Sequence, residues 1–321
     1  MHIAQKPDIK AVTDFYNRMR NTSEGSSAQG LCLRPIDEAT AARWFFGDHR
    51  VTYAVTEADE MLGLASGVYL PERKTGYLSY LCVALDRRGQ GVARELMDRL
   101  EASLFALEGC EKLDVVFHNP VNLPWYVAED GGHHHPCVPG VDVLSGLFGF
   151  LEHRGWREFV RQNAYYRLLA GYTDPPRMAE VRQRLLTEGI EVTLYDPEKH
   201  HGLAELFDNI GNPGWKAQVM AHTDQPIVVA VDHNADGLVV AYTGPLSITE
   251  GRGNFCGIGT RKEYRGRGIG KVVFCEMCAR HARNGGEFMS LYTGTNNPAR
   301  NIYEAAGFHV VRSFANMRKI K

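Results

Sequence analysis

The feature of this sequence that most restricts its fold is an internal repeat. The segment 88–93 reads RGQGVA and the segment 265–270 reads RGRGIG, and each follows an apolar, strand-like run of residues. An asparagine lies 31 positions after the arginine of each segment, at Asn119 and at Asn296. A motif that recurs in register over this distance indicates two copies of one fold in tandem.

Both halves show the same succession of predicted elements. The first half has strand-like runs at 30–35, 51–56, 61–70 and 76–84, a helix in which Val92, Leu96, Leu100 and Leu104 recur every fourth residue, and a strand at 113–117. The second half has strand-like runs at 190–195, 227–231, 238–242 and 255–260, then a glycine-rich loop and a helix, and strands at 288–292 and 308–315. Strands followed by a helix and a further strand predict an α+β fold with mixed α/β character in each half.

These patterns place the domain boundaries in the chain. A polar helix at 7–20 and a Ser/Gly-rich break at 23–30 predict an N-terminal helical lead at 1–29. We expect a first domain at 30–170, a linker and helix at 171–189, and a second domain at 190–321. Gly155 lies 67 positions after Arg88, whereas Gly307 lies 42 positions after Arg265, so the first copy contains an insertion, predicted as a loop at 125–147.

Composition excludes several kinds of partner. The 36 Lys and Arg residues nearly balance the 38 Asp and Glu residues, so no basic surface for nucleic acid is indicated. The apolar stretches are too short to span a bilayer, and the seven cysteines lack the spacing of a disulfide framework. We therefore expect a cytoplasmic protein that binds neither nucleic acid nor membrane, with a small-molecule partner; the oligomeric state is not indicated.

The glycine-rich loops have the chemistry of a phosphate site. A glycine-rich turn between a strand and a helix presents several backbone N–H groups and the positive end of the helix dipole. Gly266, Gly268 and Gly270 permit close approach of an anion in the second copy, and Arg265 and Lys271 add positive charge. Two such loops in register predict pyrophosphate binding more strongly than one loop does.

The second copy resembles the acetyl-CoA signature of the GNAT N-acetyltransferase superfamily. The resemblance rests on 265–270 and on 296–308, which reads NNPARNIYEAAGF; the first copy is similar through Arg88, Gly89, Gly91, Ala93, Asn119 and Gly155-Trp156. It implies two tandem domains, each a splayed, mostly antiparallel sheet flanked by helices. It also implies acetyl-CoA, or another short acyl-CoA, as co-substrate and transfer of the acyl group to the amine of a small molecule.

The resemblance also implies which residues bind the coenzyme. In the second half these are Ile258, Gly259, Thr260, Arg265, Gly266, Arg267, Gly268, Ile269, Gly270, Lys271, Asn296 and Asn301, and in the first half they are Leu81, Cys82, Val83, Arg88, Gly89, Gln90, Gly91, Val92, Ala93 and Asn119. Backbone groups of 258–260 and 81–83 would bind the pantetheine arm as a strand would. Backbone N–H groups near Gly259 and Thr260 would hold the oxyanion.

Tyr303 matches the tyrosine that commonly lies beside the thioester sulfur in this family, so it is the candidate proton donor to the departing thiolate. Leu151 aligns with it in the first copy, which favours the second half as the catalytic one; Tyr126 or a residue of the insertion could replace the acid. Glu250 is a candidate general base, and a relayed water is an equal alternative.

Two other patterns suggest weaker hypotheses. His133, His134, His135 and Cys137 have metal-ligand chemistry, but consecutive side chains do not converge readily on one ion. Cys275 and Cys278 form a CxxC motif inside a predicted helix, where packing explains it better than thiol activation does. The alternatives to an acyltransferase are a CoA-binding regulatory or scaffold protein, in which one or both sites are catalytically degenerate, and a thiol-redox or metal protein.

Overall fold

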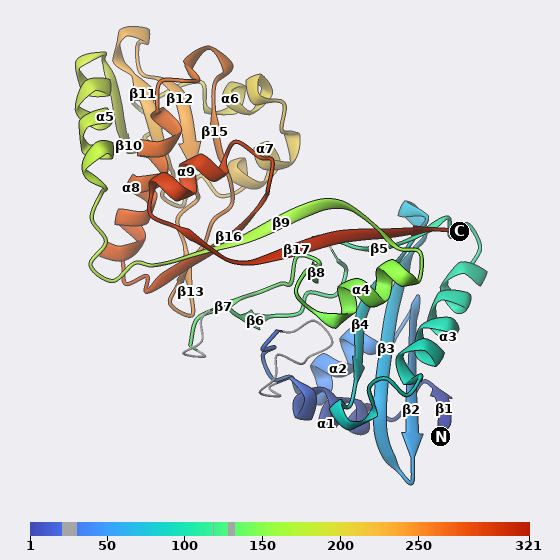
Figure 1. Ribbon diagram of the computed structural model, residues 1–321. Coiled ribbons are helices and arrows are strands. Elements are labelled where there is room, and N and C mark those ends of the chain that lie inside the picture. Colours follow the sequence, from blue (N-terminus) through green and yellow to red (C-terminus); the bar gives the residue numbers. More distant parts are fainter. Residues whose placement is uncertain (21–30, 118, 128–131) are drawn as a thin grey trace. The chain divides into compact units, whose positions relative to one another are not determined.

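The computed structural model describes residues 1–20, 31–117, 119–127 and 132–321 (Figure 1). It separates into two compact units: unit 1 comprises 1–163 and 312–321, and unit 2 comprises 164–311. The division passes through two long strands, β9 (Arg157–Leu168) and β17 (His309–Ile320).

Unit 1 is a twisted sheet flanked by helices. Its strands are β1 (His2–Gln5), β2 (Arg50–Glu57), β3 (Glu60–Leu70), β4 (Thr75–Val83), β5 (Lys112–Val115), β6 (Trp125–Tyr126), β7 (His134–His135), β8 (Val141–Asp142) and the adjoining parts of β9 and β17. Its helices are α1 (Ile9–Met19), α2 (Glu38–Phe45), α3 (Val92–Ala106) and α4 (Gly146–His153), with 3₁₀ turns η1 (Pro71–Arg73) and η2 (Leu85–Arg87). The sheet order is β1-β2-β3-β4-β5-β17-β9, with only β4 and β5 parallel among the neighbours whose register is determined.

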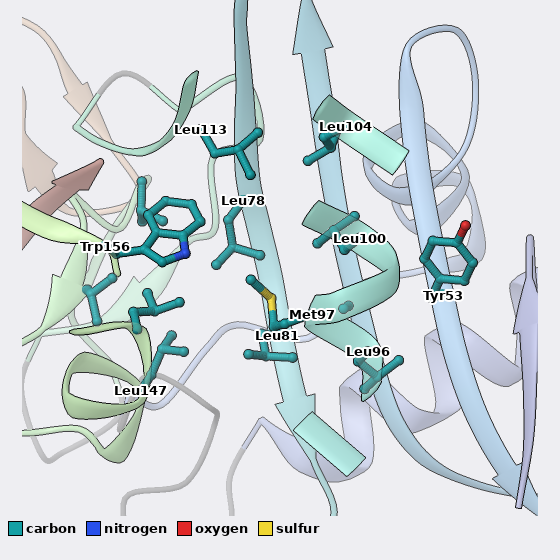
Figure 2. Close-up of a cluster of buried hydrophobic side chains, with 14 of the residues drawn as sticks. Tyr53, Leu78, Leu81, Leu96, Met97, Leu100, Leu104, Leu113, Leu147 and Trp156 are labelled. Carbon is teal, nitrogen blue, oxygen red and sulfur yellow. The ribbon is translucent and has the colours of Figure 1, made fainter. Parts of the chain in front are cut away.

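The core of unit 1 lies between α3 and the sheet. The predicted stripe on α3 is confirmed, because Val92, Leu96, Leu100 and Leu104 are all at most 2% exposed. Figure 2 shows the α3 leucines beside Leu78 and Leu81 of β4, in a cluster that also includes Trp156. A helix that repeats apolar residues at this period buries one face and leaves its other face in water.

Unit 2 repeats this arrangement with a divided sheet. Its strands are β10 (Ile190–Leu194), β11 (Val228–Asp232), β12 (Leu238–Thr243), β13 (Ile248–Thr249), β14 (Arg252–Gly253), β15 (Ile258–Thr260), β16 (Phe288–Gly294) and the adjoining parts of β9 and β17. Its helices are α5 (Pro176–Thr187), α6 (Leu203–Ile210), α7 (Pro213–Met220), α8 (Ile269–Arg283) and α9 (Arg300–Ala305), with 3₁₀ turns η3 (His233–Ala235) and η4 (Lys262–Tyr264). Strands β10-β11-β12-β15 form one antiparallel sheet, whereas β16 lies between β9 and β14 in another.

The predicted splay between the strand before the loop and the strand after the helix is present in both units. In unit 2, β15 and β16 belong to separate sheets. In unit 1, β4 pairs with β5 only from Thr75 to Tyr77, although β4 continues to Val83. The part of β4 after Tyr77, and all of β15, therefore do not pair with the strand that follows the helix.

Several sequence-based expectations need correction. The run 31–35 is not a strand; Leu33 makes only an isolated bridge to Trp125, and position 30 and the Ser/Gly-rich break at 23–30 lie outside the described residues. The N-terminal lead contains a strand, β1, that pairs with β2 and so belongs to unit 1. The insertion is not a simple loop, because the described part of it forms the β6–β7 hairpin and β8, which pairs with β17.

The C-terminal strand accounts for the largest difference from the predicted domain boundaries. Residues 312–321 belong to unit 1 rather than to the second domain, and α5, predicted as a connecting helix, packs against α8 within unit 2. Met317 of β17 faces Val115 of β5, and Arg318 donates two hydrogen bonds to the Asp114 carboxylate, at 2.7 and 2.8 Å. Strand pairing between residues about two hundred positions apart decides the boundary, and local sequence patterns do not report such pairing.

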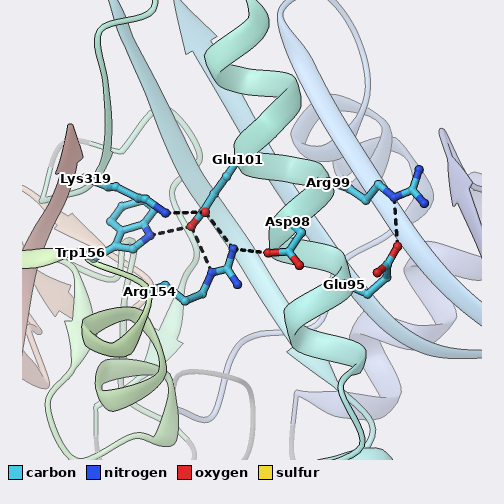
Figure 3. A network of polar contacts seen from close by, with 7 residues as sticks. All are labelled: Glu95, Asp98, Arg99, Glu101, Arg154, Trp156 and Lys319. Atoms are coloured by element: carbon cyan, nitrogen blue, oxygen red, sulfur yellow. Dashed lines mark hydrogen bonds and ion pairs between the residues drawn. The ribbon is translucent and has the colours of Figure 1, made fainter. Parts of the chain in front are cut away.

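A buried ion network joins the C-terminal strand to α3 (Figure 3). Glu101 is 6% exposed, and its carboxylate accepts hydrogen bonds from Lys319 Nζ (2.7 Å), Arg154 Nη2 (2.9 Å) and Trp156 Nε1 (2.8 Å). Burial opposes ionisation of Glu101, but the hydrogen bonds from Arg154, Lys319 and Trp156 outweigh it and hold the pKa of this carboxyl below its usual value.

Candidate functional site

The glycine-rich loop of unit 2 has the backbone conformation that only glycine adopts readily. Strand β15 leads through η4 into the loop, and Gly266 (φ 80°) and Gly268 (φ 83°) both have left-handed backbones. Gly268 is the N-cap of α8, with no side chain to satisfy the first N–H groups of the helix. These N–H groups and the positive end of the helix dipole are thus available to an anion.

The two copies of the loop make matching hydrogen bonds. Arg265 Nε donates to the Thr260 carbonyl at 3.2 Å, and Arg88 Nε donates to the Val83 carbonyl at the same distance. In unit 1, Gly91 (φ 88°) is likewise the N-cap of its helix, α3. The repeat found in the sequence is therefore a structural repeat, and each arginine stabilises the loop by bonding to the strand before it.

A cavity of about 750 Å³ lies beside this loop in unit 2. It is lined by Ile210, Gly211, Asn212, Trp215, Ile258, Gly259, Thr260, Tyr264, Arg265, Gly266, Gly268, Ile269, Gly270, Lys271, Asn297, Pro298, Ala299, Asn301 and Ile302. The lining comes from the end of α6, the start of α7, β15, the loop with the first turn of α8, and the start of α9. A cavity of this size that combines one cationic end with apolar walls suits an extended ligand with an anionic head.

Most of the coenzyme-binding residues predicted for the second half meet at this cavity. The exceptions are Arg267 and Asn296, which are not among the lining residues. Arg267 Nη2 instead pairs with Glu188 Oε2 at 2.6 Å, and the Arg267 carbonyl accepts a hydrogen bond from Arg184 at 2.6 Å. Arg267 therefore fastens the loop to α5 and the residues that follow it.

The outer edge of β15 presents alternate backbone groups to the cavity. Arg261 N donates to the Val240 carbonyl at 2.8 Å, so residues 261 and 240 form a hydrogen-bonded pair. Because such pairs alternate in an antiparallel ladder, Gly259 also faces β12, where it pairs with Tyr242. The backbone groups of Ile258 and Thr260 point the other way. The Gly259 N–H group therefore points toward β12 and away from the cavity, so its direction does not support the expectation that it holds an oxyanion. By the same alternation, the backbone groups of Cys82 face β3 in unit 1.

The charges at the loop end favour an anion. Arg265 and Lys271 line the cavity, and within the described residues neither forms an ion pair with a carboxylate. Tyr264 also lines this end, and its hydroxyl donates to Asp232 Oδ2 at 2.8 Å. Two cations, a helix N-terminus and left-handed glycines together have the charge and backbone geometry that suit a pyrophosphate.

One wall of the cavity was missed by the sequence analysis. Ile210, Gly211, Asn212 and Trp215 come from α6 and α7, neither of which was predicted. The signals for these helices are present: α6 has buried residues three and four apart at Leu203, Leu206 and Phe207, and Asn212 followed by Pro213 is a helix start. The Asn212 side chain accepts a hydrogen bond from Trp215 N at 3.0 Å and so caps α7.

Tyr303 lies in the core of unit 2, beside the cavity wall rather than on it. It is 4% exposed and packs against Phe274, with ring centroids 5.0 Å apart, and against Tyr165 and Phe255. Its chain neighbours Asn301 and Ile302 do line the cavity. Burial raises the pKa of Tyr303, so the phenol is protonated at neutral pH, which is the form that can donate a proton.

The structure does not bring Glu250 to this cavity. Glu250 is exposed at the turn between β13 and β14, has a left-handed backbone (φ 49°), and is not among the lining residues. Its position as a general base therefore has no geometric support.

Unit 1 differs from unit 2 at the matching positions. The Asn119 side chain donates to the Leu78 carbonyl at 2.9 Å and so occupies part of the outer edge of β4. Leu151 matches Tyr303, since Trp156 N donates to the Leu151 carbonyl at 3.1 Å as Phe308 N does to the Tyr303 carbonyl at 3.0 Å. Leu151 is fully buried in the core of unit 1, and its hydrocarbon side chain has no proton to donate.

The histidine and cysteine motifs do not form a second site. His134 and His135 are buried in the β7 strand, and within the described part of the chain no three His, Cys, Asp or Glu side chains are placed to hold a metal ion. Cys275 and Cys278 are buried in α8; burial raises the pKa of Cys275 to about 11 and raises the pKa of Cys278 well above its usual value. Both thiols are therefore protonated at neutral pH and unsuited to redox exchange.

Comparisons with protein families identify the fold. Residues 17–129 match the acetyltransferase (GNAT) family model, and residues 223–310 match an acetyltransferase (GNAT) domain model, so the two matches span more than half of the chain. The chain belongs to the GNAT acetyltransferase superfamily and contains two tandem GNAT domains. This confirms the fold class and the family inferred from the sequence. No curated protein sequence matches the chain.

Solved structures with the same fold share little sequence with this chain. A glucosamine N-acetyltransferase region of a fungal multi-domain GH3 β-N-acetylglucosaminidase aligns over 99% of this chain with a TM-score of 0.67 and 17% identity, but this chain covers only 38% of that protein. A tandem GNAT protein from the clavulanic acid biosynthesis pathway aligns with a TM-score of 0.58 and 15% identity, over 99% of this chain and 98% of that one. A GCN5-related N-acetyltransferase from Sphaerobacter thermophilus aligns with a TM-score of 0.58 and 16% identity, over 99% and 95% of the two chains.

In the described residues, no helix combines the length and the apolar character needed to cross a membrane.

Proposed function

We propose that this protein is an N-acyltransferase that moves an acetyl group from acetyl-CoA to the amine of a small molecule, with the cavity of unit 2 as its coenzyme site. The observation that supports this most is that a single group of elements lines the cavity: the N-terminus of α8, the glycine loop with Arg265 and Lys271, and the outer edge of β15. We further propose that it acts in the cytoplasm without nucleic acid or membrane partners.

Each part of the cavity has a role in this proposal. The loop N–H groups, Arg265 and Lys271 hold the pyrophosphate, and the backbone of Ile258 and Thr260 bonds the pantetheine arm as a neighbouring strand would. Acetyl-CoA supplies an activated acyl thioester. We assign to the outward N–H of Ile258 or Thr260 the role of stabilising negative charge on the carbonyl oxygen as the neutral amine attacks. As the C–N bond forms, the nitrogen gives up a proton to water. The C–S bond then breaks, and the thiolate receives a proton from water or from Tyr303, whose phenolate regains a proton from solvent.

The first test is stabilisation by acetyl-CoA. At a hundred times its dissociation constant, a ligand that binds only the folded state stabilises it by about 2.7 kcal/mol, which raises Tm by roughly 5 to 10 °C for a domain of this size. Gly266→Val should remove most of this shift and weaken acetyl-CoA at least tenfold, because the side chain enters the cavity where the anion approaches. Calorimetry and thermal unfolding of the full chain measure both effects.

Gly89→Val is the matched control for this variant. Gly89 (φ 73°) and Gly266 (φ 80°) have the same left-handed backbone, and a Cβ atom added at either one meets nothing within 4 Å. The two substitutions therefore impose similar strain, of order 1–3 kcal/mol. If acetyl-CoA gave no shift in the parent protein, or if Gly89→Val abolished binding and Gly266→Val did not, the site assignment would be wrong.

The second test concerns Tyr303. Tyr303→Phe keeps the ring that packs against Phe274 and removes only the hydroxyl, which within the described residues has no hydrogen-bond partner. We expect stability and acetyl-CoA affinity to change little, while kcat falls by about 10² because general-acid help is lost. A kcat equal to that of the parent protein would assign the proton transfer to water.

The acceptor is to be found with a panel of amines, with release of CoA thiol as the readout. Glucosamine is a suitable first member, because the fungal region that shares the fold is described as a glucosamine N-acetyltransferase. Amino acids, polyamines, aminoglycosides and peptide N-termini complete the panel.

A second candidate function is a CoA-binding regulatory or scaffold protein. The burial of Tyr303 behind the cavity wall and the replacement of its counterpart by Leu151 are the observations that favour it. Tight binding of acetyl-CoA with no CoA release in the presence of any amine would support this second function over the first.

A further inference from the structure

We propose that Trp215 limits the length of the acyl chain that the cavity of unit 2 accepts, so that the protein discriminates against acyl groups longer than acetyl. This inference rests on the proposed function, because it assumes that an acyl-CoA occupies the cavity.

The cavity has two chemically different ends. Arg265, Lys271 and the loop glycines form a cationic end, whereas Ile210 and Trp215 form an apolar end on the α6–α7 side. Strand β15 runs between them, from Thr260 next to the loop to Ile258, and Gly257 comes directly before this strand in the chain. A ligand with its pyrophosphate at the loop and its arm along β15 therefore places its acyl end near Gly257.

Trp215 lies directly over Gly257. A Cβ atom placed on Gly257 would be 2.9 Å from Trp215 Cε2 and 3.1 Å from the Tyr242 hydroxyl. A Cβ atom on Gly259 would be 2.8 Å from Ile210 Cδ1. At Gly257, where the backbone φ is +135°, the Trp215 ring is so close that only glycine fits, whereas at Gly259 an added Cβ atom would require the end of the Ile210 side chain to shift. The α6–α7 segment thus approaches β15 closely, and the Trp215 ring limits the room beyond the end of the arm.

The contact is supported from behind by buried aromatic rings. Trp215 meets Tyr242 edge-on, with ring centroids 6.2 Å apart, and Tyr242 meets Phe207 with centroids 4.6 Å apart. Tyr242 is fully buried and Phe207 is 1% exposed. The Trp215 indole therefore cannot move into the core to make room for a longer acyl chain, because the close-packed side chains behind it leave no space.

Unit 1 has a different arrangement at the same position. Tyr80 matches Gly257 in the repeat, since Ala84 and Arg261 make the same backbone hydrogen bond to the neighbouring strand. Tyr80 is 2% exposed and packs against Tyr16 and Phe45, with ring centroids 5.3 and 5.6 Å away. Unit 1 thus has a buried tyrosine where unit 2 has a glycine covered by Trp215, so we place the contact between an acyl group and a tryptophan in unit 2.

The experiment compares binding of acetyl-CoA and hexanoyl-CoA to the full chain by calorimetry. Hexanoyl-CoA has four more methylene groups, and each one that enters apolar space raises affinity by up to about fourfold. We expect the parent protein to bind hexanoyl-CoA no better than acetyl-CoA. In Trp215→Ala the ratio of hexanoyl-CoA to acetyl-CoA affinity should rise at least tenfold, and in Trp215→Leu, which keeps an apolar contact with Tyr242, it should rise less.

Trp44→Ala is the control, because Trp44 is a half-buried tryptophan on α2 of unit 1. It should leave the affinity ratio unchanged. An unchanged ratio in both Trp215 variants, with acetyl-CoA still bound, would overturn this inference alone, and a shift caused by Trp44→Ala instead would move the acyl end to unit 1. Failure of the parent protein to bind CoA or acetyl-CoA would overturn the proposed function together with it.

Discussion

Deletion of residues 312–321 should unfold unit 1, although these residues come last in the chain. Phe314, Ala315 and Met317 are fully buried, and the last two belong to the same core as the α3 leucines. Their loss exposes the edge of β5 and leaves the carboxylates of Asp114 and Glu101 without the cations from Arg318 and Lys319. An uncompensated buried charge alone costs about 3–5 kcal/mol, which is comparable to the whole stability of many domains.

Hydrogen exchange followed by mass spectrometry measures this result unit by unit. We expect loss of protection throughout β2 to β5 and α3 after the deletion. Removal of Lys321 alone is the control, since this residue is exposed and lies beyond the end of β17. Retention of protection in β2 to β5 after removal of all ten residues would show that unit 1 does not depend on the C-terminal strand.

Glu101→Gln should destabilise unit 1 by about 3 kcal/mol at neutral pH. The substitution removes the negative charge that the partly buried Arg154 and Lys319 share, while the amide keeps the size of the side chain. Urea unfolding of the full chain, followed by a probe in unit 1, measures the difference. Glu95→Gln is the matched control on the same helix, because Glu95 forms an exposed ion pair with Arg99 that should contribute at most about 1 kcal/mol (Figure 3).

The pH dependence of the Glu101 effect has a definite sign. The pKa of Glu101 is lowered in the folded state, so its contribution to stability is present above the unfolded-state pKa of about 4.5 and is lost as the pH falls through the folded-state value. The stability difference between the parent protein and Glu101→Gln should therefore shrink as the pH is lowered below about 4.5. A difference that stayed constant from pH 7 to pH 3 would contradict the ionised network.

Much of the fold follows from local patterns. The loops at 88–93 and 265–270 were predicted from glycines and arginines at fixed spacing, and their left-handed glycines follow from the absence of a Cβ atom. The buried stripe of α3 follows from apolar residues at helical period. In contrast, the last strand was predicted to end at 315, whereas β17 continues to Ile320. Its last part is rich in charged residues, and Arg318 and Lys319 reside in a strand because unit 1 supplies their carboxylates.

The candidate site likewise has features that local sequence patterns predict and features that depend on tertiary contacts. The sequence by itself determined the duplicated fold, the family and most of the loop end of the cavity, because each rests on residues close together in the chain. Only the tertiary structure decided that Trp215 and Ile210 close the other end, that Tyr303 packs behind the wall, and that residues 312–321 complete unit 1. The physical reason is that these features depend on which distant segments share a core or an ion pair. Asp114 and Arg318 are 204 residues apart in the chain, and only the folded molecule brings their charges together.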